Sequence, residues 1–103
     1  MNTVLGLQVN EKDNVATIFN NETKKETLVR IIDQSGKSCE LQALADIPFG
    51  HKIALKHISI GEPIIKYGQV IGVASADIVP GQYVHIHNLE SCRGRGDLEK
   101  KEE

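Results

Sequence analysis

Short apolar runs alternate with polar clusters along the whole chain, and no segment repeats its apolar residues at helical spacing for long enough to make a helix. The runs are rich in Val, Ile and Thr, which favours strands. The predicted strands are residues 4–9, 15–19, 26–32, 38–44, 52–55, 63–67, 70–74 and 83–87, with a polar loop at 20–25. Residues 33–37 carry Gly36 and predict a hairpin turn between the third and fourth strands. We therefore expect an all-β domain.

The central stretch, residues 46–88, contains one short phrase three times: an acid or His, then Ile, then a turn that ends in Gly. The three copies are Asp46-Ile47-Pro48-Phe49-Gly50, His57-Ile58-Ser59-Ile60-Gly61 and Asp77-Ile78-Val79-Pro80-Gly81. Each Gly can adopt the positive φ that other residues avoid, and a strand-like run follows each copy. Each phrase therefore predicts a corner that turns one strand into the next, and together they predict a kinked, compact β module.

Within residues 38–44, Cys39, Leu41 and Ala43 alternate with polar residues, which predicts one buried and one solvent-facing side. Cys39 is then most simply a small core residue. The chain has two cysteines, Cys39 and Cys92, far apart and in no CxxC arrangement, and we expect both to be reduced thiols.

Composition and charge narrow the function classes. The chain has 103 residues, 12 Lys and Arg, 14 Asp and Glu and a formal net charge of −2, so there is no electrostatic case for nucleic acid or an anionic membrane. No apolar run is long enough to span a membrane, and no leader pattern follows Met1, so we expect a cytoplasmic protein. We expect one domain at residues 1–88 and a flexible polar tail or linker at 89–103.

Candidate chemistry begins with His85 and His87. On a strand, two residues with this spacing project from the same face with Cα atoms about 7 Å apart. They can then share one metal ion or one anionic ligand, with Asn88 as a further polar group. Two ligands alone leave a metal site incomplete, and the same pattern also describes the wet face of an amphipathic strand.

Other cations offer anion binding, each with a plainer alternative. His51 and Lys52 follow the turn at Gly50, where they can bind a carboxylate or simply begin a solvated strand. Lys66 interrupts an apolar run, and its stem can instead cover apolar surface while its ammonium reaches water. Arg93 and Arg95 can close over a carboxylate or sulfonate or belong to an ordinary soluble tail. The chain contains no GxSxG, P-loop, GxGxxG or HExxH motif.

An ordered series of motifs resembles the N-terminal SAF domain of the altronate and galactarate dehydratase family over roughly residues 4–88. The motifs are Asp13-Asn14-Val15-Ala16, Gly50-His51-Lys52-Ile53-Ala54-Leu55, Ile58-x-x-Gly61, Ile65-Lys66-Tyr67-Gly68, Ile71-Gly72-x-Ala74, Asp77-Ile78-x-x-Gly81 and Val84-His85-x-His87-Asn88. No single motif would suffice, but their order is specific. The resemblance implies a β-clip fold, in agreement with the three corners.

The resemblance also implies partners. In this family the small domain normally precedes a much larger catalytic domain, and this chain ends at Glu103 without one. Separate small and large subunits occur among similar proteins, including sulfolactate sulfo-lyase, and residues 88–97 look most like that small subunit. We therefore expect a large catalytic subunit as partner and a small anionic substrate; a homo-oligomer stays open. The resemblance further implies iron or a similar divalent metal ion, shared with the large subunit and ligated here by His85 and His87.

The function that the resemblance implies is elimination of water or sulfite from a 2-hydroxy acid by the two subunits together. His85 and His87 are the expected catalytic residues. The expected substrate-binding residues are His51, Lys52, Lys66, Tyr67, Asn88, Arg93 and Arg95. The alternatives are a free-standing SAF module that binds a small carboxylate without chemistry, and a fragment of a longer enzyme.

Overall fold

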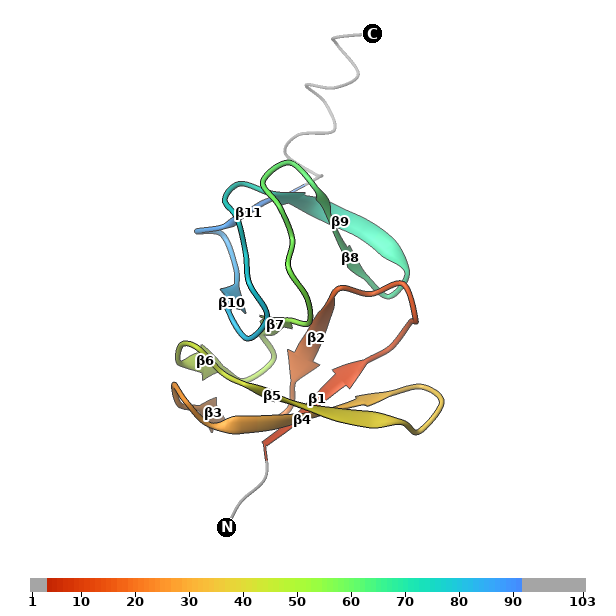
Figure 1. Ribbon diagram of the computed structural model, residues 1–103, viewed down its shortest axis with the longest axis vertical. Helices are drawn as coiled ribbons and strands as arrows, with labels where there is room; N and C mark the ends of the chain where they lie inside the picture. The colour runs from red at the N-terminus through yellow and green to blue at the C-terminus, as the bar shows by residue number, and fades with distance from the viewer. Residues whose placement is uncertain (1–3, 92–103) are drawn as a thin grey trace, which may run out of the picture.

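The computed structural model describes residues 4–91, which form strands joined by turns and corners (Figure 1). This part of the chain holds no helix long and apolar enough to cross a membrane. The strands are β1 (Val4–Gln8), β2 (Val15–Ile18), β3 (Glu22–Thr23), β4 (Leu28–Asp33), β5 (Ser38–Gln42), β6 (Ile47–Pro48), β7 (Lys52–Ala54), β8 (Pro63–Lys66), β9 (Gln69–Ala74), β10 (Tyr83–Val84) and β11 (Leu89–Ser91). The all-β prediction is confirmed, and the arrangement agrees with a β-clip.

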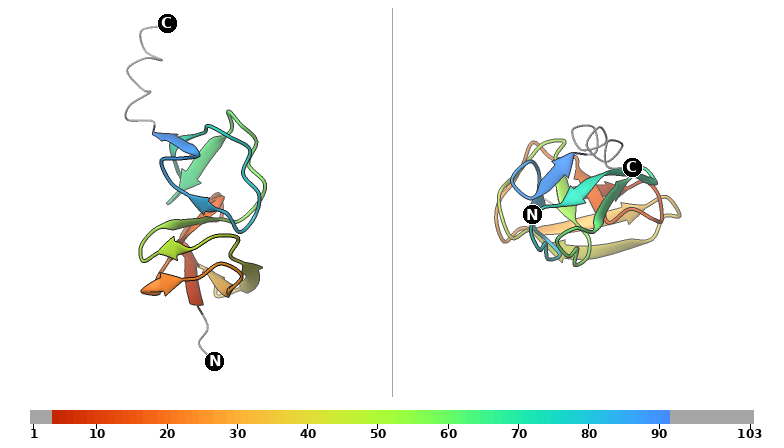
Figure 2. Two further views of the ribbon diagram at one scale, coloured as in Figure 1. Left: turned by 90° about the vertical axis from the view of Figure 1, so that its left-hand side faces the viewer. Right: turned by 90° about the horizontal axis from the view of Figure 1, so that it is seen from above.

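The strands form three sheets. A six-stranded sheet has the order β10-β7-β2-β1-β4-β5, in which only β1 and β4 pair in parallel. A three-stranded sheet has the order β11-β9-β8, and β3 pairs with β6. Figures 1 and 2 show the three-stranded sheet at one end of the molecule and β3, β4, β5 and β6 at the other. Strands β2 and β7 lie between these ends.

Two apolar clusters fill the interior, and β2 and β7 contribute to both because side chains alternate along a strand. Ala16, Ile18 and Ile53 face the first cluster, and Val15 and Ala54 face the second. The first cluster also contains Val4, Val29, Ile31, Ala43 and Ile47; the second also contains Ile58, Ile64, Ala74, Ile78 and Val84. The shared strands are therefore buried on both faces and join the two ends into one unit.

The three predicted corners are present and share one geometry. Their Ile residues, Ile47, Ile58 and Ile78, are at most 1% exposed. Their glycines have φ of 81° at Gly50, 88° at Gly61 and 95° at Gly81. In each corner the residue after Gly donates its N–H to the carbonyl three positions earlier: His51 to Pro48, Glu62 to Ser59 and Gln82 to Val79. Positive φ at the third position is the signature of a type II turn, so each Gly is required by the backbone.

The prediction that Cys39 lies in the core is wrong. Residues 34–40 are all exposed, and Cys39 is a free, exposed thiol. Strand β5 is the outer edge of the six-stranded sheet, and its hairpin with β4 extends past the apolar cluster. Of the predicted buried face, Ala43 is fully buried and Leu41 is partly buried against the first apolar cluster.

Two boundaries also differ from the prediction. The loop predicted at 20–25 contains β3, which pairs with β6 inside the first corner. Leu89–Ser91, which were predicted to open the tail, form β11 and pair with β9 in register from Leu89 opposite Ala74 to Ser91 opposite Gly72. The remainder of the predicted tail lies outside the described residues, as does Cys92.

Candidate functional site

His85 and His87 lie in a turn and not on a strand, so the predicted strand at 83–87 is wrong beyond Val84. The N–H groups of Asn88 and Leu89 both donate to the carbonyl of His85, at 3.0 and 2.8 Å. Asn88 is only 5% exposed; its Oδ1 accepts from the N–H of His85 at 3.0 Å, and its Nδ2 donates to the carbonyl of Tyr83 at 2.9 Å. Asn88, a predicted substrate-binding residue, therefore uses both of its polar side-chain atoms to hold the turn.

The turn gathers aromatic rings around Tyr83. The His85 ring stacks on the Tyr83 ring with centroids 5.6 Å apart and an angle of 7° between the planes, and the His87 ring lies 5.3 Å from it at 55°. His51 comes from the first corner, and its ring lies 4.7 Å from that of His85 and 5.6 Å from that of Tyr83. The three histidines predicted as site residues thus meet around Tyr83. We call His51, Tyr83, His85 and His87 the ring cluster.

Tyr83 was not among the site residues predicted from the sequence, although it lies two residues before His85. Its hydroxyl lies 2.8 Å from Nδ1 of His51. When the hydroxyl donates to Nδ1, neutral His51 carries its proton on Nε2 and presents it as a donor. Tyr83 is half-buried and anchors the cluster.

His51 is available for this contact because Pro48 precedes it. In the second and third corners, the side chains of Glu62 and Gln82 accept from the N–H groups of Ser59 and Val79, each at 2.7 Å. Pro48 occupies the equivalent position in the first corner and has no N–H. The His51 side chain has no such turn bond to make and reaches Tyr83.

Lys52 lies close enough to His85 to act on its pKa, and Lys66 lies close enough to Lys52 to act on the pKa of that lysine. Lys52 lies two residues before Ala54 on β7, and Lys66 two residues after Ile64 on β8, so both stems share a strand face with a residue of the second apolar cluster. Burial, followed by the positive charge of Lys66, lowers the pKa of Lys52. Within residues 4–91, neither ammonium forms an ion pair; the one ion pair in that span joins Lys24 to Glu22.

The same surroundings act on His85. Its pKa is lowered by burial and then by electrostatic interactions with His51, Lys52 and His87. A lowered pKa keeps the imidazole neutral near pH 7, which is the form that can accept a proton. The site therefore combines two unpaired ammonium groups with an imidazole that can act as a base.

Tyr67 and Gly68 form the two-residue turn between β8 and β9, with φ of 58° and 75°. Positive φ at both positions is characteristic of a type I′ turn. The Tyr67 side chain is exposed, and Nζ of Lys66 lies 4.9 Å from its ring centroid, a cation–π distance. Arg93 and Arg95 lie outside the described residues.

The predicted metal ligands, His85 and His87, are not part of a complete ligand set within the described residues. Among residues 4–91, no three His, Cys, Asp or Glu side chains are grouped so that they could hold a metal ion. His85 and His87 pack against Tyr83 as rings. The described residues therefore do not fit a metal ion by themselves.

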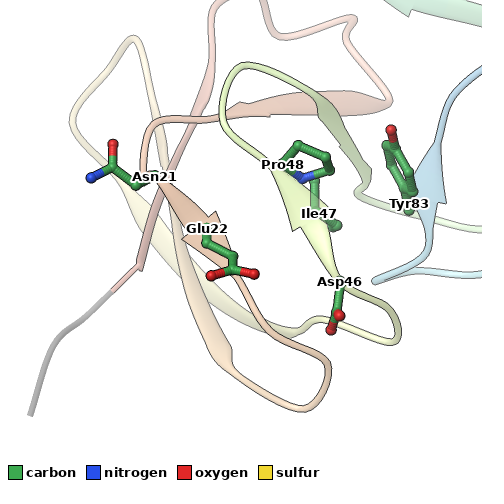
Figure 3. A pocket seen from close by; sticks show the side chains of 6 residues that line it. All are labelled: Asn21, Glu22, Asp46, Ile47, Pro48 and Tyr83. Atoms are coloured by element: carbon green, nitrogen blue, oxygen red, sulfur yellow. The ribbon is translucent and has the colours of Figure 1, made fainter.

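A pocket of about 390 Å³ is lined in part by Tyr83 of the ring cluster (Figure 3). It is lined by Asn21, Glu22, Asp46, Ile47, Pro48 and Tyr83. Two carboxylates make this pocket unsuited to an anion. The ring cluster with Lys52 and Lys66 is therefore the better candidate for an anion-binding surface within the described residues.

With this geometry established, comparison with known proteins identifies the family. The family model described as the altronate/galactarate dehydratase SAF domain matches residues 4–92. The chain belongs to this family. The match includes β11, which agrees with a domain that extends beyond residue 88.

Relatives of two kinds resemble this SAF domain. The (2R)-sulfolactate sulfo-lyase subunit alpha of Paracoccus pantotrophus is 40% identical over 63 residues, which cover 61% of this chain and 94% of the relative. The altronate dehydratase of Bacillus subtilis is 38% identical over 85 residues, which cover 82% of this chain but 16% of the relative. The galactarate dehydratase (L-threo-forming) of Escherichia coli is 37% identical over 82 residues, 14% of its length. The chain thus corresponds to nearly all of the first relative and to a small part of the dehydratases.

Proposed function

We propose that this chain is the small subunit of a two-component lyase that eliminates water or sulfite from a small 2-hydroxy acid. The observation that carries the proposal is the surface at Lys52, Lys66 and the ring cluster. Both lysines are half-buried and have no acidic partner in residues 4–91, Lys66 acts on Lys52, and Lys52 acts on His85, whose pKa is lowered. Supporting it, a relative named as a subunit is matched over 94% of its length. The large subunit would supply the rest of the active site.

The roles follow from charge and position. Lys52 and Lys66, with Tyr67 beside Lys66, bind the carboxylate of the substrate, and Arg93 and Arg95 add charge from outside the described residues. His51 donates from Nε2 to an oxygen of the substrate. His85 and His87 are the catalytic residues, with neutral His85 as the base. Asn88 positions His85 through the turn.

The elimination is balanced without an oxidant or reductant. The base takes the proton from the carbon next to the carboxylate, and that electron pair forms a double bond to the neighbouring carbon. The bond from that carbon to its oxygen or sulfur substituent breaks. Sulfite leaves with the bonding electrons, whereas a hydroxyl group takes a proton from the protonated base or from solvent and leaves as water. The resulting enol becomes a 2-keto acid. Cations near the carboxylate stabilise the charge that develops during proton removal.

We expect that the double variant His85→Ala and His87→Ala folds normally but lowers kcat/KM of the complex by about 100-fold or more, as is typical for loss of a general base. The measurement is keto-acid release from (2R)-sulfolactate, altronate or galactarate by the chain co-purified with a large subunit of this family. His57→Ala is the matched control, because His57 is an exposed histidine in the second corner.

Full activity of the double variant would reject the catalytic role. A wild-type chain that binds a small carboxylate but associates with no large subunit would instead support the free-standing binding module.

A further inference from the structure

The turn that presents Lys66 is strained. Tyr67 adopts a left-handed conformation with φ of 58°, which a bulky residue with a Cβ atom normally avoids. Asn or Gly would occupy this type I′ position at lower cost. A residue kept in a disfavoured conformation at the edge of a candidate site suggests that its side chain is needed there, and here the Tyr67 ring lies against the ammonium of Lys66.

A buried carboxylate on a distant segment holds this turn. Asp13, in the loop between β1 and β2, is 2% exposed. Its Oδ1 accepts from the N–H of Gly68 at 2.8 Å, and its Oδ2 accepts from the N–H of Asn10 at 3.1 Å. The Asn10 side chain lies so close to Gly68 that a Cβ there would come within 2.8 Å of Asn10 Nδ2. The loop therefore fixes the turn in two ways: Asp13 accepts a hydrogen bond from Gly68, and the Asn10 side chain packs closely against Gly68.

Asn14 holds the strand that leads into the turn. It is 8% exposed; its Nδ2 donates to the carbonyl of Pro63 at 3.0 Å, and its Oδ1 accepts from the N–H of Ile65 at 2.8 Å. Its backbone N–H donates to the carbonyl of Ile65 at 3.2 Å, and its carbonyl accepts from the N–H of Leu55 at 2.9 Å. Asn14 thus links β8, which carries Lys66, to the end of β7, which carries Lys52.

We propose that Asp13 and Asn14 are positioning residues of the anion site, which hold the strained turn of Lys66 and Tyr67 beside Lys52. This role rests on the proposed function for its substrate, but the contacts that carry it belong to this chain. Neither residue touches the anion. They act by fixing where the Lys66 ammonium stands before a ligand arrives, which reduces the ordering cost of binding.

The test compares Asp13→Ala with Asp33→Ala. Asp33 is a matched control because its Oδ1 likewise accepts turn N–H groups, those of Ser35 and Lys37, but in the β4–β5 hairpin. In wild-type chain, the Tyr67 ring should shift the side-chain proton resonances of Lys66 upfield. Asp13→Ala should abolish that shift and raise the KM of the complex for (2R)-sulfolactate or altronate about tenfold, with kcat changed less than twofold, as expected for lost ground-state binding. Asp33→Ala should change neither quantity.

Asp13→Asn keeps an oxygen acceptor for Gly68 and should give an intermediate KM and an intermediate Lys66 shift; this variant decides the matter if Asp13→Ala does not fold. Equal Lys66 shifts and equal KM values in the Asp13 and Asp33 variants would overturn the positioning role. If the wild-type complex eliminates none of (2R)-sulfolactate, altronate and galactarate, the proposed function fails. The Lys66 resonances of the isolated full-length variants then still decide the positioning role.

Discussion

His51, Glu62 and Gln82 follow the glycines of three equivalent corners, yet only His51 belongs to the candidate site. Glu62 and Gln82 use their side chains to complete their own turns. Pro48 removes the N–H that would have occupied His51, and the imidazole turns to Tyr83 instead. At the scale of single residues, the role of each of these side chains depends on whether its own turn offers it a backbone N–H to accept from.

The lowered pKa of His85 gives a prediction for stability against pH. In the folded chain the pKa of His85 lies below its usual value of 6.5, so the unfolded chain binds more protons as pH falls through that value. The stabilisation is complete above the unfolded pKa and is lost as pH falls through the folded pKa. We expect the wild-type chain to lose more unfolding free energy than His85→Gln between about pH 7 and pH 5, measured by urea titration. Identical losses would mean that His85 is not perturbed.

At the scale of elements, the three corners have the same backbone geometry but different surroundings. A Cβ at Gly50 would meet no atom within 4 Å, whereas a Cβ at Gly81 would collide with the carbonyl oxygen of Gln42 and meet Leu44. Both positions have positive φ, so either Ala variant carries a backbone cost of about 1–2 kcal/mol.

We therefore expect Gly50→Ala to lose about 1–2 kcal/mol of unfolding free energy and Gly81→Ala to lose at least 1 kcal/mol more, because backbone must move to relieve the collision. Thermal or urea unfolding of the two variants checks the difference. Equal losses would show that the contact with Gln42 relaxes without cost.

The β8–β9 turn gives a prediction in which stability and function move in opposite directions. Tyr67→Asn should raise the unfolding free energy by about 0.5–1 kcal/mol, because Asn tolerates left-handed geometry better than Tyr. The same change removes the ring beside Lys66, so the complex should bind its hydroxy acid less tightly. Denaturant unfolding and the KM of the complex measure the two effects, and a fall in both stability and affinity would contradict the strain argument.

At the scale of the whole molecule, the two apolar clusters depend on each other through β2 and β7, and β11 closes the second one. Leu89 packs against the second cluster and pairs with Ala74. Removal of residues 89–103 should therefore lower the melting temperature more than removal of residues 92–103. Calorimetry of the two truncated chains tests this expectation, which fails if their melting temperatures coincide.

The sequence by itself determined the all-β class, the three corners and most strand positions. These features depend on local rules: Gly permits positive φ, Pro removes a donor, and apolar alternation marks a strand face. The motifs also pointed to His51, Lys52, Lys66, His85 and His87 as residues worth examining. These local rules do not specify which segments of the chain lie next to one another.

Only the tertiary structure decided how the site is assembled. Pairing of β7 with β10 brings His51 to Tyr83 across 32 positions, and Asn88 bends the chain so that His85 and His87 leave the strand. Asp13 meets Gly68 across 55 positions. The edge position of β5 likewise exposed Cys39, although its local pattern was that of a core residue. Such contacts depend on sheet order and register, where a shift of one residue turns every side chain to the other face, so local patterns do not specify them.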